Sequence, residues 1–233
     1  MNRSDPSAAA EDYLKAILEI QNRRDSDLAS MGDVSTALDL TPGTVTTMVR
    51  RLADDGLLDY RPRKGCRLTP AGRRAALRIL RRHRVLETYL VMNLGLDWAE
   101  VHGEAERMEH GASDRVIDRM WESLGRPGRD PHGGAIPDEN LMMPDDDGDV
   151  PLSSLGDGKS GVLTRFPDRD PDLLQALRGA GLRPGARFSV IRREGTGTLE
   201  LHGPEGILNL SAAVAGTLRA TPQEEKEPRT SPR

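Results

Sequence analysis

With 233 residues, the chain is long enough for two domains and a small third one, at about 100–200 residues per domain. Hydrophobic residues make up 36 % and aromatic residues 3 %, against 30 % charged residues, which favours several small cores over one large aromatic core. The sequence lacks both an apolar run of about 18 residues and an apolar N-terminal signal core, and Cys66 is its single cysteine; a cytoplasmic protein without disulfides or a multi-cysteine metal cage is expected.

Charge is divided unevenly along the chain. From Thr41 to Arg84 there are 12 Lys and Arg residues against 3 Asp and Glu, and from Asp97 to Asp172 there are 8 against 19. A basic block beside an acidic one indicates a polyanion partner for the first and cations or solvent for the second. Two ordinary solvated surfaces are the alternative that composition alone leaves open.

The first part of the chain reads as helices followed by a hairpin. Apolar residues recur at helical spacing, and Thr41-Pro42-Gly43 breaks the pattern where Pro42 can open a new helix. In chain order we predict helices over 8–23 and 27–40, a third from Pro42 to Asp55, a hairpin of 57–61 with 66–69, and a helix over about 70–92. This order is typical of a winged helix-turn-helix.

The third helix and the hairpin are the predicted DNA-binding elements. Val45, Met48, Val49 and Leu52 form the core stripe of this helix, so the other residues face outward to read the major groove or hold phosphates. The predicted contacts are Thr44, Thr46, Thr47, Arg50 and Arg51 of the helix and Arg61, Arg63, Lys64 and Arg67 of the wing. For any one of them a solvated surface is the alternative, and the set together favours DNA.

The remainder divides into a helical region, a connecting segment and a β-rich region. Residues 126–160 are rich in Pro, Gly and Asp; the acidic run at 145–149 lacks the spacing of a calcium loop, which favours a solvated linker. Short strands at roughly ten-residue spacing beyond 161 predict a small β-barrel. The expected domains are 1–72 (winged helix-turn-helix), 73–140 (helical), 141–160 (linker), 161–221 (β-barrel) and 222–233 (disordered tail).

Three of the five histidines lie among glutamates between residues 83 and 110. Residues three and four apart share a helix face, so Glu106, Glu109 and His110 project from one side, and His83 pairs with Glu87 in the same way. Facing helices that offer carboxylates and imidazoles hold metals inside helical bundles, and a divalent ion removes the repulsion between neighbouring carboxylates. A charged helix face is the alternative for each motif alone. His132 and His202 lie outside this cluster and are expected to be structural.

Several motifs together resemble the diphtheria-toxin-repressor family of metal-dependent transcriptional regulators. The motifs are Glu11-Asp12-Tyr13-Leu14, Thr44-Val45-Thr46, Leu68-Thr69-Pro70-Ala71-Gly72, His83 to Glu87, His102 to His110, the Pro-His-Gly and Ile-Pro stretches at 131–137, and 163–185. The resemblance covers nearly the whole chain. It implies an α+β fold, mainly α, with a winged helix-turn-helix, a helical dimerisation domain that bears the metal sites, and a C-terminal SH3-like barrel.

The resemblance also implies two metal sites. The primary site takes Asp12, Glu106, Glu109 and His110, and the second takes His83, Glu87 and His102, to which Asp168 of the barrel could add a ligand. Iron-responsive members resemble this chain except that sulfur-bearing residues stand at the positions of Asp12 and Glu106. Because oxygen ligands suit Mn²⁺, manganese is favoured over Fe²⁺, and Co²⁺, Ni²⁺, Zn²⁺ or Cd²⁺ could substitute in vitro.

Two residues depart from the family pattern. Lys15 stands where short manganese-type members resemble one another in having a glutamate ligand, and because an ammonium cannot coordinate a metal, this departure disfavours their two-metal cluster. Arg165 stands, with Asp168, where long members look to donate Glu and Gln, and Arg165 cannot ligate.

The expected function is that of a repressor, not an enzyme, in which one ion pins the first helix and sets the spacing of two recognition helices in a homodimer on a palindromic operator. The alternatives are a metal-independent winged-helix regulator and, more weakly, a metal-dependent hydrolase, for which no pocket loop or separate general base is evident. Cys66 is expected to be a packed strand residue, with a redox role as the alternative.

Overall fold

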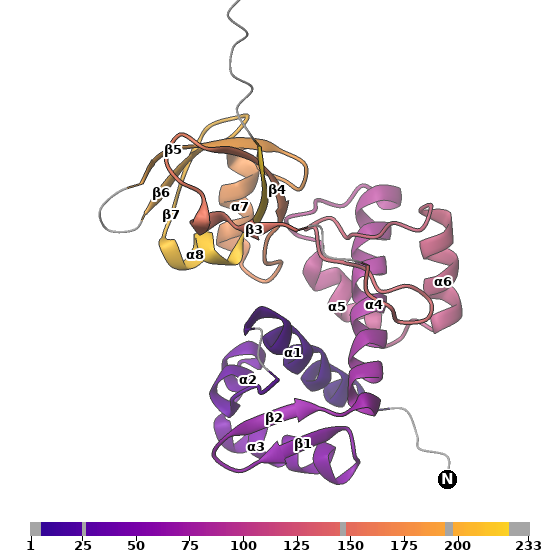
Figure 1. Ribbon diagram of the computed structural model, residues 1–233. Coiled ribbons are helices and arrows are strands. Elements are labelled where there is room, and N and C mark those ends of the chain that lie inside the picture. Colours follow the sequence, from indigo (N-terminus) through magenta and orange to yellow (C-terminus); the bar gives the residue numbers. More distant parts are fainter. Residues whose placement is uncertain (1–5, 25–26, 145–147, 194–197, 224–233) are drawn as a thin grey trace, which may run out of the picture.

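The computed structural model of the chain describes residues 6–24, 27–144, 148–193 and 198–223, and it contains three packed units joined in chain order (Figure 1). The winged-helix unit and the C-terminal sheet unit both lie against the central helical unit. No helix of the described residues combines the length and the apolar character that a membrane span needs.

The first unit is the predicted winged helix-turn-helix. Its elements are α1 (Ala8–Arg24), α2 (Met31–Leu38), α3 (Pro42–Asp54), β1 (Leu58–Arg61) and β2 (Gly65–Leu68). Helix α2 is shorter than expected, because Ser30 caps its first turn and Asp39 takes a left-handed backbone conformation (φ 51°) that ends it. The wing is tied to the helices through backbone hydrogen bonds between Ala29 and Cys66. At Gly65 a Cβ would lie 2.4 Å from the Ala29 carbonyl oxygen, so this close approach requires glycine.

The second unit is built from α4 (Pro70–Leu94), α5 (His102–Glu109) and α6 (Asp114–Ser123). Helix α4 starts directly after the wing and runs the whole way into this unit (Figure 1). Segment 126–138, expected to have little core of its own, instead packs tightly here, with Ile136 buried. The apolar side chains of Met92, Leu94 and Val116 remain exposed on this unit.

The third unit is a six-stranded antiparallel sheet with strand order β3-β8-β4-β5-β6-β7. Its elements are β3 (Val150–Pro151), η1 (Leu152–Ser154), β4 (Ser160–Arg165), α7 (Pro171–Gly179), β5 (Arg187–Arg193), β6 (Leu199–His202), β7 (Ile207–Leu210), α8 (Ala212–Thr217) and β8 (Arg219–Gln223). The expected start at 161 is too late, because β3 pairs with β8 and Leu152 is fully buried in this core.

The last residue of the acidic run, Asp149, is part of the folded C-terminal unit and not of a solvated linker. Asp149 is buried and accepts hydrogen bonds from Arg219 Nε (2.7 Å) and Thr164 Oγ1 (2.8 Å), so it belongs to the sheet unit. Residues 145–147 of the acidic run and the tail from 224 lie outside the described residues.

Candidate metal centre and nucleic-acid interface

Residues from α1 and α5 meet between the winged-helix and helical units. Asp12, Glu109 and His110 bring ligand atoms within 4.8 Å of one another. His110 Nε2 lies 2.9 Å from Asp12 Oδ1 and 3.7 Å from Glu109 Oε1. Its other nitrogen, Nδ1, lies 2.8 Å from Glu11 Oε2. Glu11 thus holds one ring nitrogen of His110 and the other faces the cluster, which is how metal-binding histidines are oriented.

The fourth residue implied for this site, Glu106, lies beside the cluster rather than in it. Its Oε1 atom is 3.4 Å from His102 Nε2, 3.6 Å from Lys15 Nζ and 3.7 Å from Arg169 Nη2. The hydrogen bond with His102 and the charges of Lys15 and Arg169 lower the pKa of Glu106 to about 2, although its partial burial opposes this. Glu106 thus stays a carboxylate, held between the two clusters by three cationic or protonatable groups.

Lys15 is the least expected member of this region, because it is fully buried (1 % exposed). Its Nζ atom lies 2.5 Å from Glu109 Oε1, and the other oxygen of Glu109 lies 2.6 Å from His83 Nδ1. Burial alone would raise the pKa of Glu109, but the His83 hydrogen bond and the Lys15 charge lower it. The ammonium therefore supplies part of the positive charge that the buried carboxylate needs.

The second implied site is assembled on α4, α5 and the loop after β4. Glu87 Oε1 lies 3.0 Å from His83 Nε2 and 3.2 Å from His102 Nδ1, and Asp168 Oδ2 lies 3.8 Å from the same His102 atom. These four residues form one group whose ligand atoms all lie within 4.8 Å. Burial would lower the pKa of His83, but Glu87 and Glu109 raise it to about 10.

A third group was missed from the sequence, and it shares Glu87. Glu87 Oε2 lies 3.6 Å from His132 Nδ1, and Asp130 Oδ1 lies 4.0 Å from the same nitrogen. His132 is therefore not outside the metal-ligand region as expected. His132 Nε2 donates to the Trp98 carbonyl (2.7 Å), so Nδ1 is the ring nitrogen that faces the two carboxylates. Burial would lower the pKa of His132, but Glu87 and Asp130 raise it to about 9.

The donor atoms of this region fit a divalent cation. Glu87 Oε2 and His132 Nδ1 are buried and have no hydrogen-bond partner among the described residues. Leaving such atoms unpaired is costly, and an ion that both could ligate would remove that cost. The mixture of carboxylate oxygens and imidazole nitrogens suits Mn²⁺, Fe²⁺ or Zn²⁺ more than a thiolate-seeking ion.

A cavity of about 540 Å³ opens onto the primary cluster where the three units meet. Asp12 and Lys15 of α1, Leu38 of α2, Glu106 of α5 and Arg169 of the C-terminal unit are among the residues that line it. The cavity gives solvent and ions a path to Asp12 and His110.

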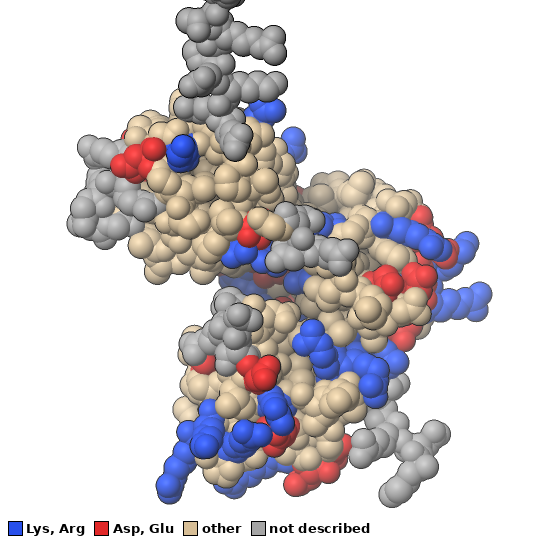
Figure 2. Space-filling view, in the orientation of Figure 1, with Lys and Arg blue, Asp and Glu red and all other residues tan. Residues whose placement is uncertain are grey.

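The predicted DNA-contact residues lie on the surface of the winged helix. Thr44, Thr47, Arg50 and Arg51 of α3 are exposed and Thr46 is half-buried, while Arg61, Arg63, Lys64 and Arg67 are exposed on the wing. Basic side chains gather over this unit at the bottom of the view in Figure 2.

The threonine hydroxyls of α3 are occupied within the helix. Thr46 Oγ1 donates to the Pro42 carbonyl (2.8 Å) and Thr47 Oγ1 donates to the Gly43 carbonyl (3.0 Å). These threonines can therefore offer a methyl group or an acceptor lone pair to a base edge, with the hydroxyl proton already used.

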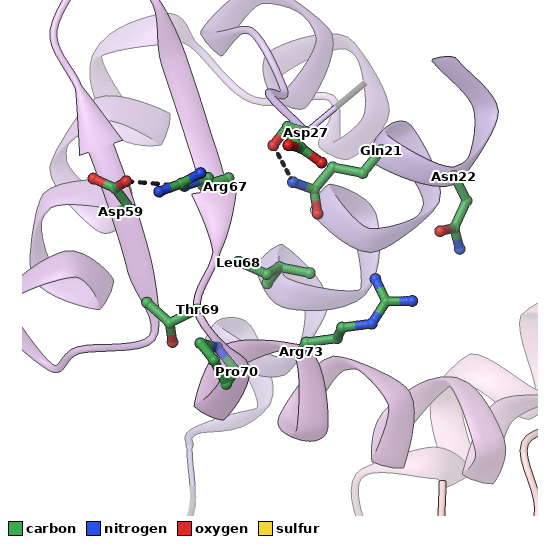
Figure 3. A pocket seen from close by; sticks show the side chains of 9 residues that line it. All are labelled: Gln21, Asn22, Asp27, Asp59, Arg67, Leu68, Thr69, Pro70 and Arg73. Carbon is green, nitrogen blue, oxygen red and sulfur yellow. Dashed lines mark hydrogen bonds and ion pairs between the residues drawn. The ribbon is translucent and has the colours of Figure 1, made fainter. Parts of the chain in front are cut away.

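A separate pocket of about 610 Å³ lies between the end of α1, the wing and the start of α4 (Figure 3). Asp59 and Arg67 form an ion pair across the wing on its wall (2.9 Å), and Arg73 and Gln21 also line it. The three metal-ligand groups found among the described residues all lie elsewhere.

The two remaining candidates carry no site chemistry. Cys66 is fully buried, and burial raises the pKa of its thiol to about 12, so the redox alternative is wrong and the packing interpretation holds. His202 is exposed at the end of β6.

A winged DNA-binding unit whose first helix shares a ligand cluster with a second domain defines a class of metal-responsive DNA-binding proteins. Three family models match the chain in the same order as its units. They are described as the N-terminal DNA binding domain of iron dependent repressors (residues 5–66), their metal binding and dimerisation domain (69–138) and the FeoA domain (150–221).

Individual proteins agree with the family models. The chain is 34 % identical over 209 residues to the iron-dependent repressor IdeR of Mycobacterium tuberculosis, covering 84 % of this chain and 90 % of that one. It is 36 % identical over 116 residues to the transcriptional regulator MntR of Lysinibacillus sphaericus, covering 49 % and 81 %. A solved manganese-dependent transcriptional repressor in complex with manganese superposes with a TM-score of 0.83 at 34 % identity, over 92 % of this chain and all of that one.

The chain therefore belongs to the iron-dependent repressor family, which includes the diphtheria toxin repressor and MntR-type regulators. The relatives named above are described as repressors or transcriptional regulators, and none of them as an enzyme. The expected fold, with a helical dimerisation domain and an SH3-like C-terminal domain, is confirmed.

Proposed function

We propose that this protein is a metal-activated transcriptional repressor of metal homeostasis that binds operator DNA as a homodimer. The observation that carries the proposal is the primary cluster itself: Asp12 comes from the first helix of the DNA-binding unit, whereas Glu109 and His110 come from the helical unit. When bound, a divalent cation supplies positive charge at the junction of the two units. Asp12, Glu109 and His110 would hold it, with Glu106 as the nearest further carboxylate.

The ligand cluster acts on DNA binding through the position of the winged helix. Helices α1 and α3 share one core, which includes Ile17 of α1 and Val49 of α3. Fixing α1 against α5 therefore also fixes the position of α3. In a dimer this sets the separation of two recognition helices, which must match the helical repeat of a palindromic operator. A coupling free energy of about 1–3 kcal/mol is enough to change occupancy about 5–150-fold, and it is reciprocal, so DNA should tighten metal binding.

Manganese is the metal that we favour, because Asp12 and Glu106 both offer oxygen where sulfur would favour a softer ion. Ferrous iron is the second candidate, in keeping with the iron-dependent relatives, and Co²⁺, Ni²⁺, Zn²⁺ and Cd²⁺ are expected to substitute in vitro. As a protein that acts on operator DNA, it is expected in the cytoplasm.

Duplex affinity measured against each metal tests this function. A duplex selected from a randomised pool with the Mn²⁺-loaded full chain serves as the probe, and its dissociation constant is compared in Mn²⁺, Fe²⁺, Zn²⁺, Co²⁺ and a chelator, at a stated salt concentration. We expect the chelator to weaken binding at least fivefold, and both Asp12→Ala and His110→Ala to abolish the difference. Equal affinity with and without chelator would instead establish the metal-independent regulator.

A second ion would be held around Glu87, for which two ligand sets compete. One set adds His83, His102 and Asp168, and the other adds Asp130 and His132. Mn²⁺ titration calorimetry of His102→Asn and His132→Phe separates them, because only loss of a true ligand removes the second binding event. An unchanged second binding event in both variants would show that neither His102 nor His132 is needed to hold the second ion.

A further inference from the structure

A short loop of the C-terminal unit, residues 167–169 between β4 and α7, reaches the winged helix. Phe166 fixes the start of the loop. Its ring is buried, with the centroid 5.5 Å from that of Trp98, and the Phe166 backbone N–H donates to the His132 carbonyl (3.1 Å). Asp170 fixes its end by capping α7, accepting from the Leu173 N–H (3.1 Å). A three-residue loop held at both ends presents its side chains in defined positions.

Arg169 in this loop contacts the other two units at once. Its Nη2 atom lies 3.4 Å from Glu19 Oε2 of α1 and 3.7 Å from Glu106 Oε1 of α5, and its Nη1 atom donates to the Ala37 carbonyl of α2 (3.4 Å). Ala37 stands in the last turn of α2, the first helix of the helix-turn-helix. The negative end of a helix favours a cation there.

The neighbouring residue, Asp168, points to the second candidate metal site. Its Oδ2 atom lies 3.8 Å from His102 Nδ1, and it completes the group of His83, Glu87 and His102. Adjacent Cα atoms are about 3.8 Å apart, so whatever fixes Asp168 also restricts Arg169. One dipeptide thus faces a metal-ligand cluster on one side and the DNA-binding unit on the other.

We propose that Arg169 is a positioning residue that transmits occupancy of the Asp168 site to the helix-turn-helix, by holding Glu19 and the end of α2 in the DNA-binding arrangement. This coupling rests on the proposed function, because it presupposes that metal loading changes duplex affinity. In this proposal the C-terminal unit contributes Asp168 as a metal ligand and also acts directly on the position of the winged helix through Arg169.

The chemistry explains why the residue is an arginine. A planar guanidinium has separate N–H groups that can serve a carboxylate and a carbonyl together, whereas a lysine ammonium on a flexible stem is a single point charge. Arg169→Lys is therefore expected to keep only part of the effect, and Arg169→Met, which keeps an apolar stem, to lose it.

The quantity to measure is the gain, defined as the duplex dissociation constant in chelator divided by that in Mn²⁺. The selected duplex and the full chain are used throughout. We expect Arg169→Met and Glu19→Ala each to lower the gain by about 3–10-fold, as for a partly exposed ion pair with an added hydrogen bond. Since both variants break the ion pair between Arg169 and Glu19, the double variant should lower the gain no further than the larger single change. Arg183→Met, at an exposed arginine of the same unit, is the matched control and should leave the gain unchanged.

Two further measurements distinguish metal-dependent coupling from a stabilising contact that is independent of metal. In an Asp168→Asn background, Arg169→Met should change the gain no further. In DNA-free protein, Mn²⁺ calorimetry should give the same number of ions for Glu19→Ala as for the unmodified chain, because Glu19 belongs to none of the ligand groups.

The results that overturn the coupling differ from those that overturn the function. An unchanged gain in Arg169→Met and Glu19→Ala would refute it. This includes an equal loss of duplex affinity in chelator and in Mn²⁺, which would mean that Arg169 stabilises the DNA-binding arrangement whether or not metal is bound. A gain of one in the unmodified chain would refute the proposed function itself, and the coupling with it.

Discussion

Replacing Lys15 by methionine removes a buried ammonium and keeps most of its volume. In the metal-free protein Glu109 then loses the cation 2.5 Å from its Oε1 atom while it stays fully buried. Breaking one partner of a buried ion pair costs about 3–5 kcal/mol. We expect the lower end, because the hydrogen bond from His83 to Glu109 remains and Glu106, the other partner, is half-exposed.

Metal should restore part of what Lys15→Met loses. A divalent cation on Asp12, Glu109 and His110 would return positive charge to the orphaned carboxylate, so the loaded protein should be destabilised less than the metal-free one. A loss of about 3 kcal/mol lowers the midpoint of thermal unfolding by about 6–12 °C for a chain of this size. If metal recovers about 1.4 kcal/mol of it, Mn²⁺ affinity rises about tenfold.

Thermal unfolding and Mn²⁺ calorimetry of the full chain, each with a chelator arm, measure both quantities. Lys159→Met, at an exposed lysine of the C-terminal unit, is the control and should change neither. Equal destabilisation with and without Mn²⁺, at unchanged metal affinity, would refute the reasoning, because Lys15 would then have no electrostatic link to the metal ligands.

Three other variants test the orientation of a ligand, the DNA surface and the acid stability of the sheet unit. Glu11→Gln should weaken Mn²⁺ affinity about 10–100-fold in calorimetry, because Glu11 orients His110, whereas Glu100→Gln at an exposed site should not. Arg50→Ala should weaken binding to selected and random duplexes alike and reduce the slope of log affinity against log salt by about 1; loss for the selected duplex alone would point to base contact instead. Burial would raise the pKa of Asp149, but hydrogen bonds from Arg219 and Thr164 hold it below its usual value. Its stabilising effect is therefore complete above about pH 4 and is lost as the pH falls through the lowered pKa. Asp149→Asn should thus unfold at a lower temperature than the unmodified chain at pH 7 and approach it in acid; a difference independent of pH would contradict this.

Local patterns predicted most of the helices and strands correctly. Thr41 and Pro42 mark the start of α3, and the spacing of His83 and Glu87 places both on one face of α4, as found. Helix α8 was missed, because its six residues are too few to show a helical period.

The candidate site was harder to predict where it depends on segments far apart in the chain. No local rule says that Glu11 meets His110 or that His132 meets Glu87, since each contact forms only when separate elements pack. The buried position of Lys15 runs against the usual exposure of lysine, and only the two carboxylates around it explain it. Asp168 came from the family resemblance, and the structure places it beside His102.

Helix α4 has 25 residues and belongs to both the winged-helix and the helical units. At 1.5 Å per residue it is a rod about 37 Å long. A tilt of about 5° at its inner end would carry the wing about 3 Å sideways, close to the 3.4 Å rise of one base pair. In a dimer, the two α4 helices set the separation of the two winged helices. A small rotation at the inner ends of these helices is enough to bring the winged helices into or out of register with the duplex.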